Sequence, residues 1–213
     1  MKTILALFES LGAILRNTHV VYTSGKHGNA YVNKDVIYPH TEAVYRLCFL
    51  MAKQLENAGI DVVAGPAMGG LILAQWVAFH LSQLTGREVL AVYAEKEGEG
   101  FAFRRGQDKL IVGKRVLVVE DILTTGGSVK KVNATVRADE GHLVVVFALC
   151  NRGCVTCEMI DSPLLYTLVD INLQSYEPDN CPLCHDGVPI NMSVGHGKQF
   201  LLDHPELAHL APK

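Results

Sequence analysis

Residues 116–128 read VLVVEDILTTGGS, and this stretch decides the fold class. Four consecutive apolar residues, 116–119, are typical of a strand that is buried on both faces, and such strands occur in parallel sheets covered by helices. Ligands of these sheets bind just beyond the carboxyl ends of the strands. Because two acids, Glu120 and Asp121, stand at that point, we expect the functional site there.

The two acids suit a sugar or a metal ion. Neighbouring side chains of an extended chain point to opposite sides, so Glu120 and Asp121 can hold different hydroxyls of a diol or address a hydrated Mg²⁺. A carboxylate that is buried needs a partner, which makes two plain core positions a poor explanation.

The turn that follows suits a phosphate. It combines backbone amides, hydroxyl groups and two glycines directly before an expected helix at 128–139, and the amides at a helix N-terminus bind anions. Neither a Walker pattern nor a Gly-x-Gly-x-x-Gly pattern can be written through it. A diol clamp joined to a phosphate loop describes a site for ribose 5-phosphate; the alternative is an ordinary turn with surface acids.

The rest of the chain repeats the strand-turn-helix pattern. Short apolar runs alternate with segments of helical periodicity, which favours an α/β fold with a mostly parallel sheet. We expect strands at 61–64, 89–93, 116–119, 143–149 and 164–173, and helices at 5–15, 41–57, 71–84 and 128–139.

Composition limits the remaining possibilities. The 213 residues carry 19 basic and 22 acidic side chains, mixed along the chain, so a nucleic-acid partner has no support. The apolar run near the N-terminus is shorter than the roughly 7 to 15 residues of a signal-peptide core, and we expect a cytoplasmic protein. The expected organisation is a single domain, 1–213, in which 154–213 forms a cysteine-containing extension.

Residues 116–128 resemble the 5-phosphoribosyl 1-pyrophosphate (PRPP) motif of type I phosphoribosyltransferases. Four further segments are similar in order and spacing to the orotate branch of that family. They are 24–27, 31–35, 64–70 and 151–153, and the resemblance covers about residues 1 to 190.

The resemblance implies a fold, a reaction and a set of site residues. The fold is a central, mostly parallel sheet flanked by helices, with a small hood. The reaction is a pentosyl transfer from PRPP to orotate, with Mg²⁺, in pyrimidine biosynthesis by a homodimer. The implied PRPP contacts are Lys26, Gly69, Gly70, Lys96, Glu120, Asp121, Thr124, Thr125, Gly126, Gly127 and Ser128, and the implied orotate contacts are Thr124 and Arg152.

The segment 93–106, YAEKEGEGFAFRRG, differs from the best-known form of the family's catalytic loop. Lys96 aligns with a catalytic lysine, whereas Glu95 stands where that form has an arginine. Arg104 and Arg105 resemble a subgroup with two arginines after the loop. A charged loop hinged by glycines is suited to close over an anion, so we expect a mobile lid in which Lys96, with Glu120 and Asp121, takes part in catalysis.

Two other functions fit the same residues. One is a transferase of this fold that acts on another nucleobase. The other is a PRPP-binding sensor without catalytic activity, because the altered loop leaves room for binding without transfer.

Two Cys-x-x-Cys pairs, Cys154 with Cys157 and Cys181 with Cys184, predict a structural Zn²⁺. Four thiolates would complete a closed tetrahedral shell. If the expected strand at 164–173 is parallel to its neighbour, the second pair returns to the sheet edge where the first lies. The alternative is a pair of packed turns, because cysteine is commonly buried without a metal.

Overall fold

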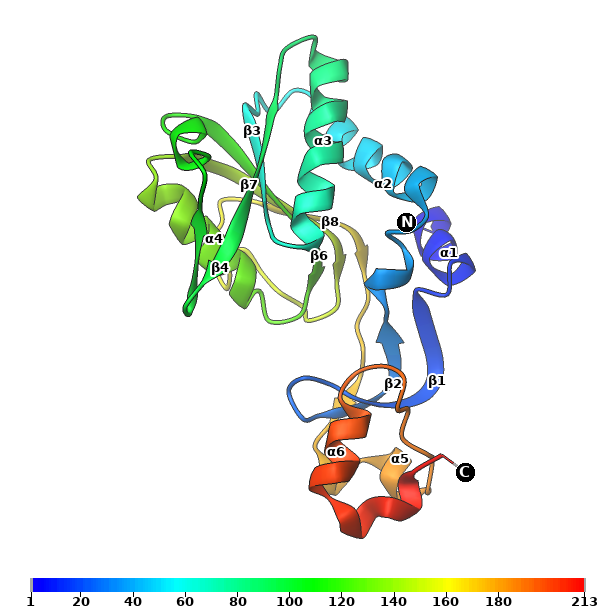
Figure 1. The fold of residues 1–213 in the computed structure, drawn as a ribbon. Coiled ribbons are helices and arrows are strands. Elements are labelled where there is room, and N and C mark those ends of the chain that lie inside the picture. Colours follow the sequence, from blue (N-terminus) through cyan, green and yellow to red (C-terminus); the bar gives the residue numbers. More distant parts are fainter. Residues whose placement is uncertain (1, 213) are drawn as a thin grey trace. The chain divides into compact units, whose positions relative to one another are not determined.

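The computed structural model describes residues 2–212, which form two compact units. The larger unit spans 40–171, and the smaller one joins 2–39 to 172–212 (Figure 1). The expected single domain, 1–213, with an extension at 154–213 stays a prediction. The last strand of the sheet, residues 165–170, belongs to the larger unit. The N-terminal segment 2–39 and the C-terminal segment 172–212 together form the smaller unit.

The larger unit is built on a six-stranded sheet, in which five strands are parallel and the edge strand β5 runs antiparallel to β4. This confirms the predicted α/β class. The strand order is β5-β4-β3-β6-β7-β8, with bounds β3 (Val62–Pro66), β4 (Leu90–Glu97), β5 (Gly100–Phe103), β6 (Arg115–Leu123), β7 (His142–Asn151) and β8 (Leu165–Asp170).

Helices cover the sheet of this unit. The helix α3 (Gly69–Thr85) packs on β3, β4 and β6 and also contacts α2 (Thr41–Gln54), while α4 (Gly127–Ala138) packs on β5, β6 and β7. A short 3₁₀ turn, η2 (Asp108–Leu110), precedes β6. Because β6 lies in the middle of the sheet, residues 116–121 are all buried, as the continuous apolar run predicted.

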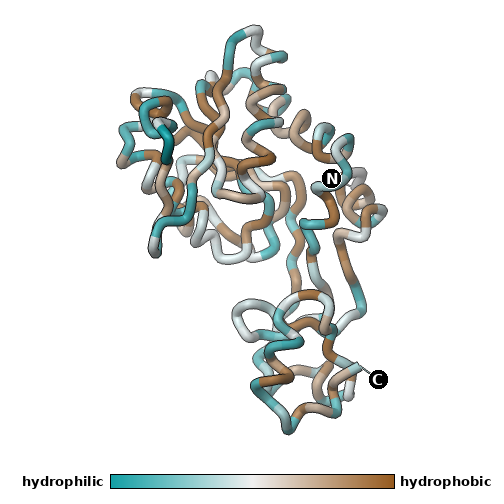
Figure 2. The backbone as a smooth tube through the Cα atoms, viewed as in Figure 1, coloured by the Kyte–Doolittle hydropathy of each residue, from teal (hydrophilic) through white to brown (hydrophobic). Residues whose placement is uncertain are grey.

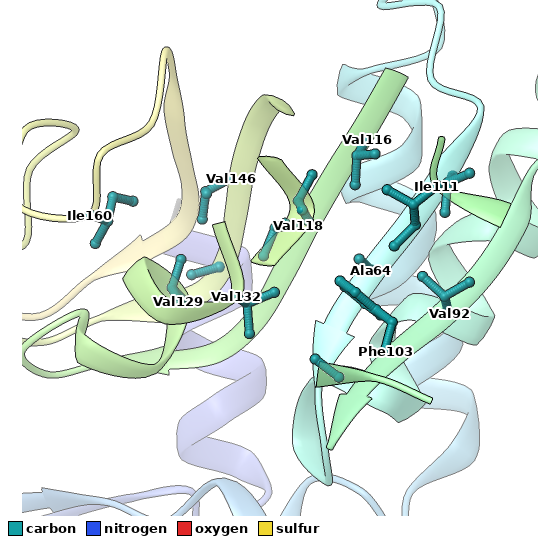
Figure 3. Packing of buried hydrophobic residues seen from close by; sticks show 14 of the residues in the cluster. Ala64, Val92, Phe103, Ile111, Val116, Val118, Val129, Val132, Val146 and Ile160 are labelled. Carbon is teal, nitrogen blue, oxygen red and sulfur yellow. The ribbon is translucent and has the colours of Figure 1, made fainter. Parts of the chain in front are cut away.

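One face of the sheet packs against α4. Val129 and Val132 of that helix lie against Val118 of β6 and Val146 of β7 (Figure 3). The strands carry mostly hydrophobic residues, and hydrophilic ones gather in the turns (Figure 2). This apolar packing fixes the strand ends from which the site is built.

The smaller unit contains an antiparallel sheet with the order β1-β2-β9. Its elements are α1 (Lys2–Ser10), β1 (Ile14–Val21), β2 (His27–Val32), η1 (Lys34–Val36), β9 (Ser175–Tyr176), η3 (Pro178–Asn180), α5 (Pro182–His185), α6 (Gly197–Asp203) and η4 (Pro205–Leu210). A buried cluster of Val21, Ile190 and Leu210 packs under α6 residues such as Phe200.

The predicted first helix, 5–15, is wrong at its C-terminal end. The helix ends at Ser10, and Ile14 and Leu15 begin β1 instead. Gly12 has a φ of 70°, a left-handed conformation that ends the helix, and Ile14 and Leu15 pair with β2. The apolar spacing that predicts one helical face runs across two elements, α1 and β1.

Among residues 2–212, no helix is both long enough and apolar enough to cross a membrane.

Candidate functional site

The site lies where the direction of the chain through the sheet changes. From β3 the chain passes through α3 to β4 on one side, and from β6 it passes through α4 to β7 on the other. Since β3 and β6 are parallel neighbours, their carboxyl ends share one edge and the two following turns border a crevice. Ligands of open α/β sheets bind at such a point.

Glu120 and Asp121 lie within the last part of β6, since the strand runs on to Leu123. Their exposed fractions are 8% and 3%. The Asp121 amide donates to Glu120 Oε1 at 3.0 Å, and the Ile122 amide donates to Asp121 Oδ1 at 2.6 Å. The backbone thus fixes both carboxylates at the end of the central strand, and Glu120 lines the hollow that follows it.

A small polar hollow follows the acids. Its volume is about 150 Å³, and it is lined by Glu120, Ile122, Leu123, Thr124, Thr125, Gly126, Gly127, Ser128 and Val129. The helix α4 begins at Gly127, so its first amides and the positive end of its dipole border the hollow. A hollow of this size with such a lining suits a phosphate group.

Only glycine fits at position 126. Its φ is 75°, and a Cβ atom there would lie 3.0 Å from Val155 Cγ1 and closer still to Ile160. The packing of these two residues therefore fixes the turn before α4. The Gly127 amide donates to Thr125 Oγ1 at 3.3 Å, so the threonine side chain also shapes the turn.

A second helix start borders the same crevice. The helix α3 begins at Gly69, and two residues separate it from the end of β3 at Pro66. A Cβ on Gly70 would lie 2.9 Å from Gly65 Cα, so this turn packs too closely for any other residue. Its free amides form a second anion-binding feature beside the first.

Thr124 and Arg152, the two predicted orotate contacts, lie side by side. Arg152 Nε donates to Thr124 Oγ1 at 2.9 Å, and the amides of Arg152 and Gly153 donate to the Leu123 carbonyl at 2.9 and 3.2 Å. A planar guanidinium at this position suits a planar carboxylate.

Asn151 holds this turn, a role that sequence reasoning missed. Its Nδ2 donates to the Val155 carbonyl and its Oδ1 accepts from the Val155 amide, both at 3.0 Å. Asn151 is buried at the end of β7, directly before Arg152. Only its place beside the arginine in the sequence hinted at this function.

The expected lid is a β-hairpin. The strand β4 extends to Glu97, and Lys96 pairs with Phe101 of β5. Arg105 forms an ion pair with Glu95 at 3.1 Å, and Arg104 forms one with Glu97. Lys96 is exposed on the same hairpin, while each arginine already has an acidic partner.

The four cysteines of the predicted metal site divide between the two units. Cys154 is exposed and Cys157 is half-buried, and both belong to the larger unit, whereas Cys181 and Cys184 belong to the smaller one. The strand β8 is parallel to β7, as that prediction required. Beyond β8 the chain pairs through β9 with β2, and Cys181 and Cys184 lie beside His19 and His27 within the smaller unit.

His19 and His27, rather than Cys154 and Cys157, lie beside Cys181 and Cys184, and the ligand atoms of these four residues are within 4.8 Å of one another. Burial lowers the pKa of His19, and burial together with the nearby His19 and His204 lowers the pKa of His27 to about 4. Both imidazoles are therefore neutral at pH 7. Burial, with Cys181 close by, raises the pKa of Cys184 to about 12.

Lys26 also belongs to the smaller unit, where its Nζ pairs with Glu177 at 2.8 Å. It directly precedes His27 in the turn between β1 and β2. Its contact with PRPP stays a prediction.

Together, two anion-binding helix starts and a pair of acids at a sheet's switch point define an α/β protein for a phosphorylated sugar. Residues 35–179 match the model of the phosphoribosyl transferase domain. The chain therefore belongs to the phosphoribosyltransferase family.

Within that family, the similar sequences are orotate phosphoribosyltransferases. The orotate phosphoribosyltransferase of Desulforamulus reducens is 36% identical over 188 residues, which covers 88% of this chain and 93% of the relative. The orotate phosphoribosyltransferase of Pelotomaculum thermopropionicum is 38% identical, covering 87% and 93%.

Solved structures agree on the fold. The orotate phosphoribosyltransferase of Aeropyrum pernix has a TM-score of 0.63 at 22% identity, covering 78% of this chain and 93% of that one. The Mycobacterium tuberculosis orotate phosphoribosyltransferase in complex with PRPP has a TM-score of 0.60 at 23% identity, covering 79% and 94%.

Asn151→Ala should destabilise the protein by about 2 kcal/mol, because it leaves the buried amide and carbonyl of Val155 without partners. Urea denaturation followed by circular dichroism measures the change, with exposed Asn57→Ala as the control. A variant as stable as the control would show that Asn151 does not hold the turn.

Proposed function

We propose that the protein is an orotate phosphoribosyltransferase, which transfers the 5-phosphoribosyl group from PRPP to orotate and releases pyrophosphate. One observation carries the proposal: Glu120 of the acid pair lines the phosphate-sized hollow, and Arg152 donates a hydrogen bond to Thr124 in the same lining. The relatives that share more than a third of the sequence are named for this activity.

PRPP is bound from both ends in this proposal. Glu120 and Asp121 accept hydrogen bonds from the ribose hydroxyls, and the turn 124–128 holds the 5-phosphate. The turn before α3, with Gly69 and Gly70, receives the pyrophosphate. Two helix starts at one sheet edge support this assignment, because the substrate is phosphorylated at two positions.

Orotate lies between the ribose and Arg152. The guanidinium binds the carboxylate of the base, and Thr124 contributes a hydroxyl group. The bond from Arg152 Nε to Thr124 supports this assignment, since it holds the guanidinium in one orientation.

Glu120 and Asp121 would hold the Mg²⁺ ion that accompanies PRPP. The carboxylate oxygens of Glu120 and Asp121 are hard donors of the kind that Mg²⁺ accepts, so the residues present fit the ion. When bound, the ion neutralises charge on the leaving group.

The reaction needs no covalent intermediate with the protein. Orotate N1 forms a bond to the anomeric carbon, the bond from that carbon to the pyrophosphate oxygen breaks, and the N1 proton passes to solvent. The protein orients the two substrates and stabilises the charge that develops on the ring and the leaving group. Lys96 supplies a cation for the leaving group, whereas Arg104 and Arg105 must first leave Glu97 and Glu95 to do so.

The proposal includes a homodimer. Tyr45, Phe49 and Leu50 of α2 and Phe79 of α3 are large apolar side chains with exposed fractions of 38–45%, and α2 and α3 pack together. A shared apolar patch of this kind suits a second copy of the chain. Sedimentation that found only monomers at micromolar concentration would contradict it.

We also propose that the protein acts in the cytoplasm. Its six cysteines are free thiols, which a reducing compartment protects. Recovery of the protein in an exported fraction of its native cells would contradict this.

The function is tested by an assay of the purified protein with PRPP, Mg²⁺ and a panel of nucleobases. The proposal expects pyrophosphate release with orotate and little with adenine, guanine or uracil. Transfer to another base would favour the alternative transferase. PRPP binding by calorimetry without transfer to any base would favour a sensor, which the ion-paired arginines of the hairpin also permit.

Asp121→Asn should weaken PRPP binding roughly 10- to 150-fold, because a charge-assisted hydrogen bond is worth about 1.5 to 3 kcal/mol. Titration calorimetry measures this, and circular dichroism checks that the fold is intact. Binding as tight as in the wild type would refute the assignment to the ribose hydroxyls.

Arg152→Ala should raise the KM for orotate at least tenfold and change the KM for PRPP much less, because the carboxylate loses its partner while the sugar contacts stay. Arg137→Ala, which removes an arginine paired with Asp161 on the surface, is the matched control. Equal losses for both substrates would show that Arg152 does not select the base.

A further inference from the structure

Four side chains that no part of the proposed reaction uses converge inside the smaller unit. His19 comes from β1, His27 begins β2, and Cys181 and Cys184 flank the first turn of α5. Their ligand atoms all lie within 4.8 Å of one another. His19 and His27 are fully buried, Cys181 is 3% exposed, and Cys184 is half-buried.

The spacing of these atoms suits a tetrahedral metal ion. His19 Nε2 lies 3.7 Å from Cys181 Sγ and 3.7 Å from Cys184 Sγ, and His27 Nδ1 lies 3.2 Å from Cys184 Sγ. The usual Zn–N and Zn–S bond lengths put the edges of such a tetrahedron at about 3.3 to 3.8 Å. The two nitrogens are 2.9 Å apart, so a small separation of the rings completes the fit.

The surroundings orient His19 as a ligand. Its Nδ1 lies 2.8 Å from the Val188 carbonyl, which can only accept, so Nδ1 carries the proton and Nε2 directs its lone pair into the cluster. Metal-bound histidines commonly donate their other ring N–H to a carbonyl in this way. The His19 backbone is fixed as well, because its carbonyl accepts a hydrogen bond from the Asn191 amide at 2.7 Å.

We propose that His19, His27, Cys181 and Cys184 bind one structural Zn²⁺ ion. Two imidazoles and two thiolates are a donor set that zinc prefers. Because all four positions come from the protein, the shell is closed and leaves no place for a substrate. The ion therefore stabilises the fold and takes no part in transfer.

A metal ion at this position would crosslink two segments of the smaller unit that are far apart in the chain. The cluster of Val21, Ile190 and Leu210 is an apolar contact between the same two segments. Small units are commonly held by metals or disulfides in addition to their cores. The ion ties the hairpin of β1 and β2 to the C-terminal segment, and it fixes the turn that carries Lys26.

The first experiment measures zinc in protein purified without a histidine tag under reducing conditions. Elemental analysis should find about one equivalent per chain in the wild type and less than a tenth in Cys184→Ser and His27→Gln. Two matched controls should keep the wild-type content: the double variant Cys154→Ser/Cys157→Ser, which removes the other Cys-x-x-Cys pair, and His185→Gln, which removes an exposed histidine beside Cys184.

Several outcomes would overturn the proposal. One is a wild type with under a tenth of an equivalent and normal folding in chelator. Another is equal loss of zinc from the double cysteine control. A third is a disulfide between Cys181 and Cys184, which would appear as two thiols unreactive after denaturation without reductant.

A second measurement does not depend on any variant folding. Wild-type protein whose zinc is exchanged for Co²⁺ should show the visible bands of a tetrahedral ion and thiolate-to-cobalt charge transfer. Bands of an octahedral ion without charge transfer would contradict the ligand set. Neither measurement involves PRPP or orotate, so the test of the metal site is independent of the test of the proposed activity.

Discussion

The pairing of β6 with β3 on one side and β7 on the other is the constraint on which the site depends. Parallel pairing brings the carboxyl ends of all three strands to one edge, and burial on both faces of β6 fixes its register. The acids of β6, the helix start after β3 and the arginine after β7 are therefore neighbours. A slip of one residue would turn Glu120 and Asp121 to the opposite faces.

The segment 93–106, which covers most of the hairpin of β4 and β5, carries three acidic and three basic side chains. Glu95 occupies the position of an arginine, yet it pairs with Arg105, and Glu97 pairs with Arg104. These ion pairs are exposed, and exposed pairs contribute little free energy, so they can open when a multiply charged anion competes for the arginines. Both arginines of the hairpin are therefore ion-paired with glutamates, and the Lys96 side chain is exposed on the same hairpin.

The smaller unit has a different source of order. The larger unit is held by apolar strands and helices, whereas the smaller one combines a short antiparallel sheet with a compact cluster of histidines and cysteines. Its two chain segments meet only in the folded protein. The alternation of apolar strands and helices in the sequence therefore predicted the larger unit well and the smaller unit poorly.

The sequence alone determined the parallel α/β class, the acid pair and the phosphate turn, because each is a contiguous segment whose periodicity or composition has a local cause. It misplaced the end of the first helix, since apolar spacing continued across the turn at Gly12. Only the tertiary structure decided that Asn151 clamps the arginine turn and that His19 and His27 join Cys181 and Cys184. The reason is physical: the Asn151 contact spans four residues of an irregular turn that has no periodicity, and the cluster depends on the pairing of β9 with β2, which brings distant segments together.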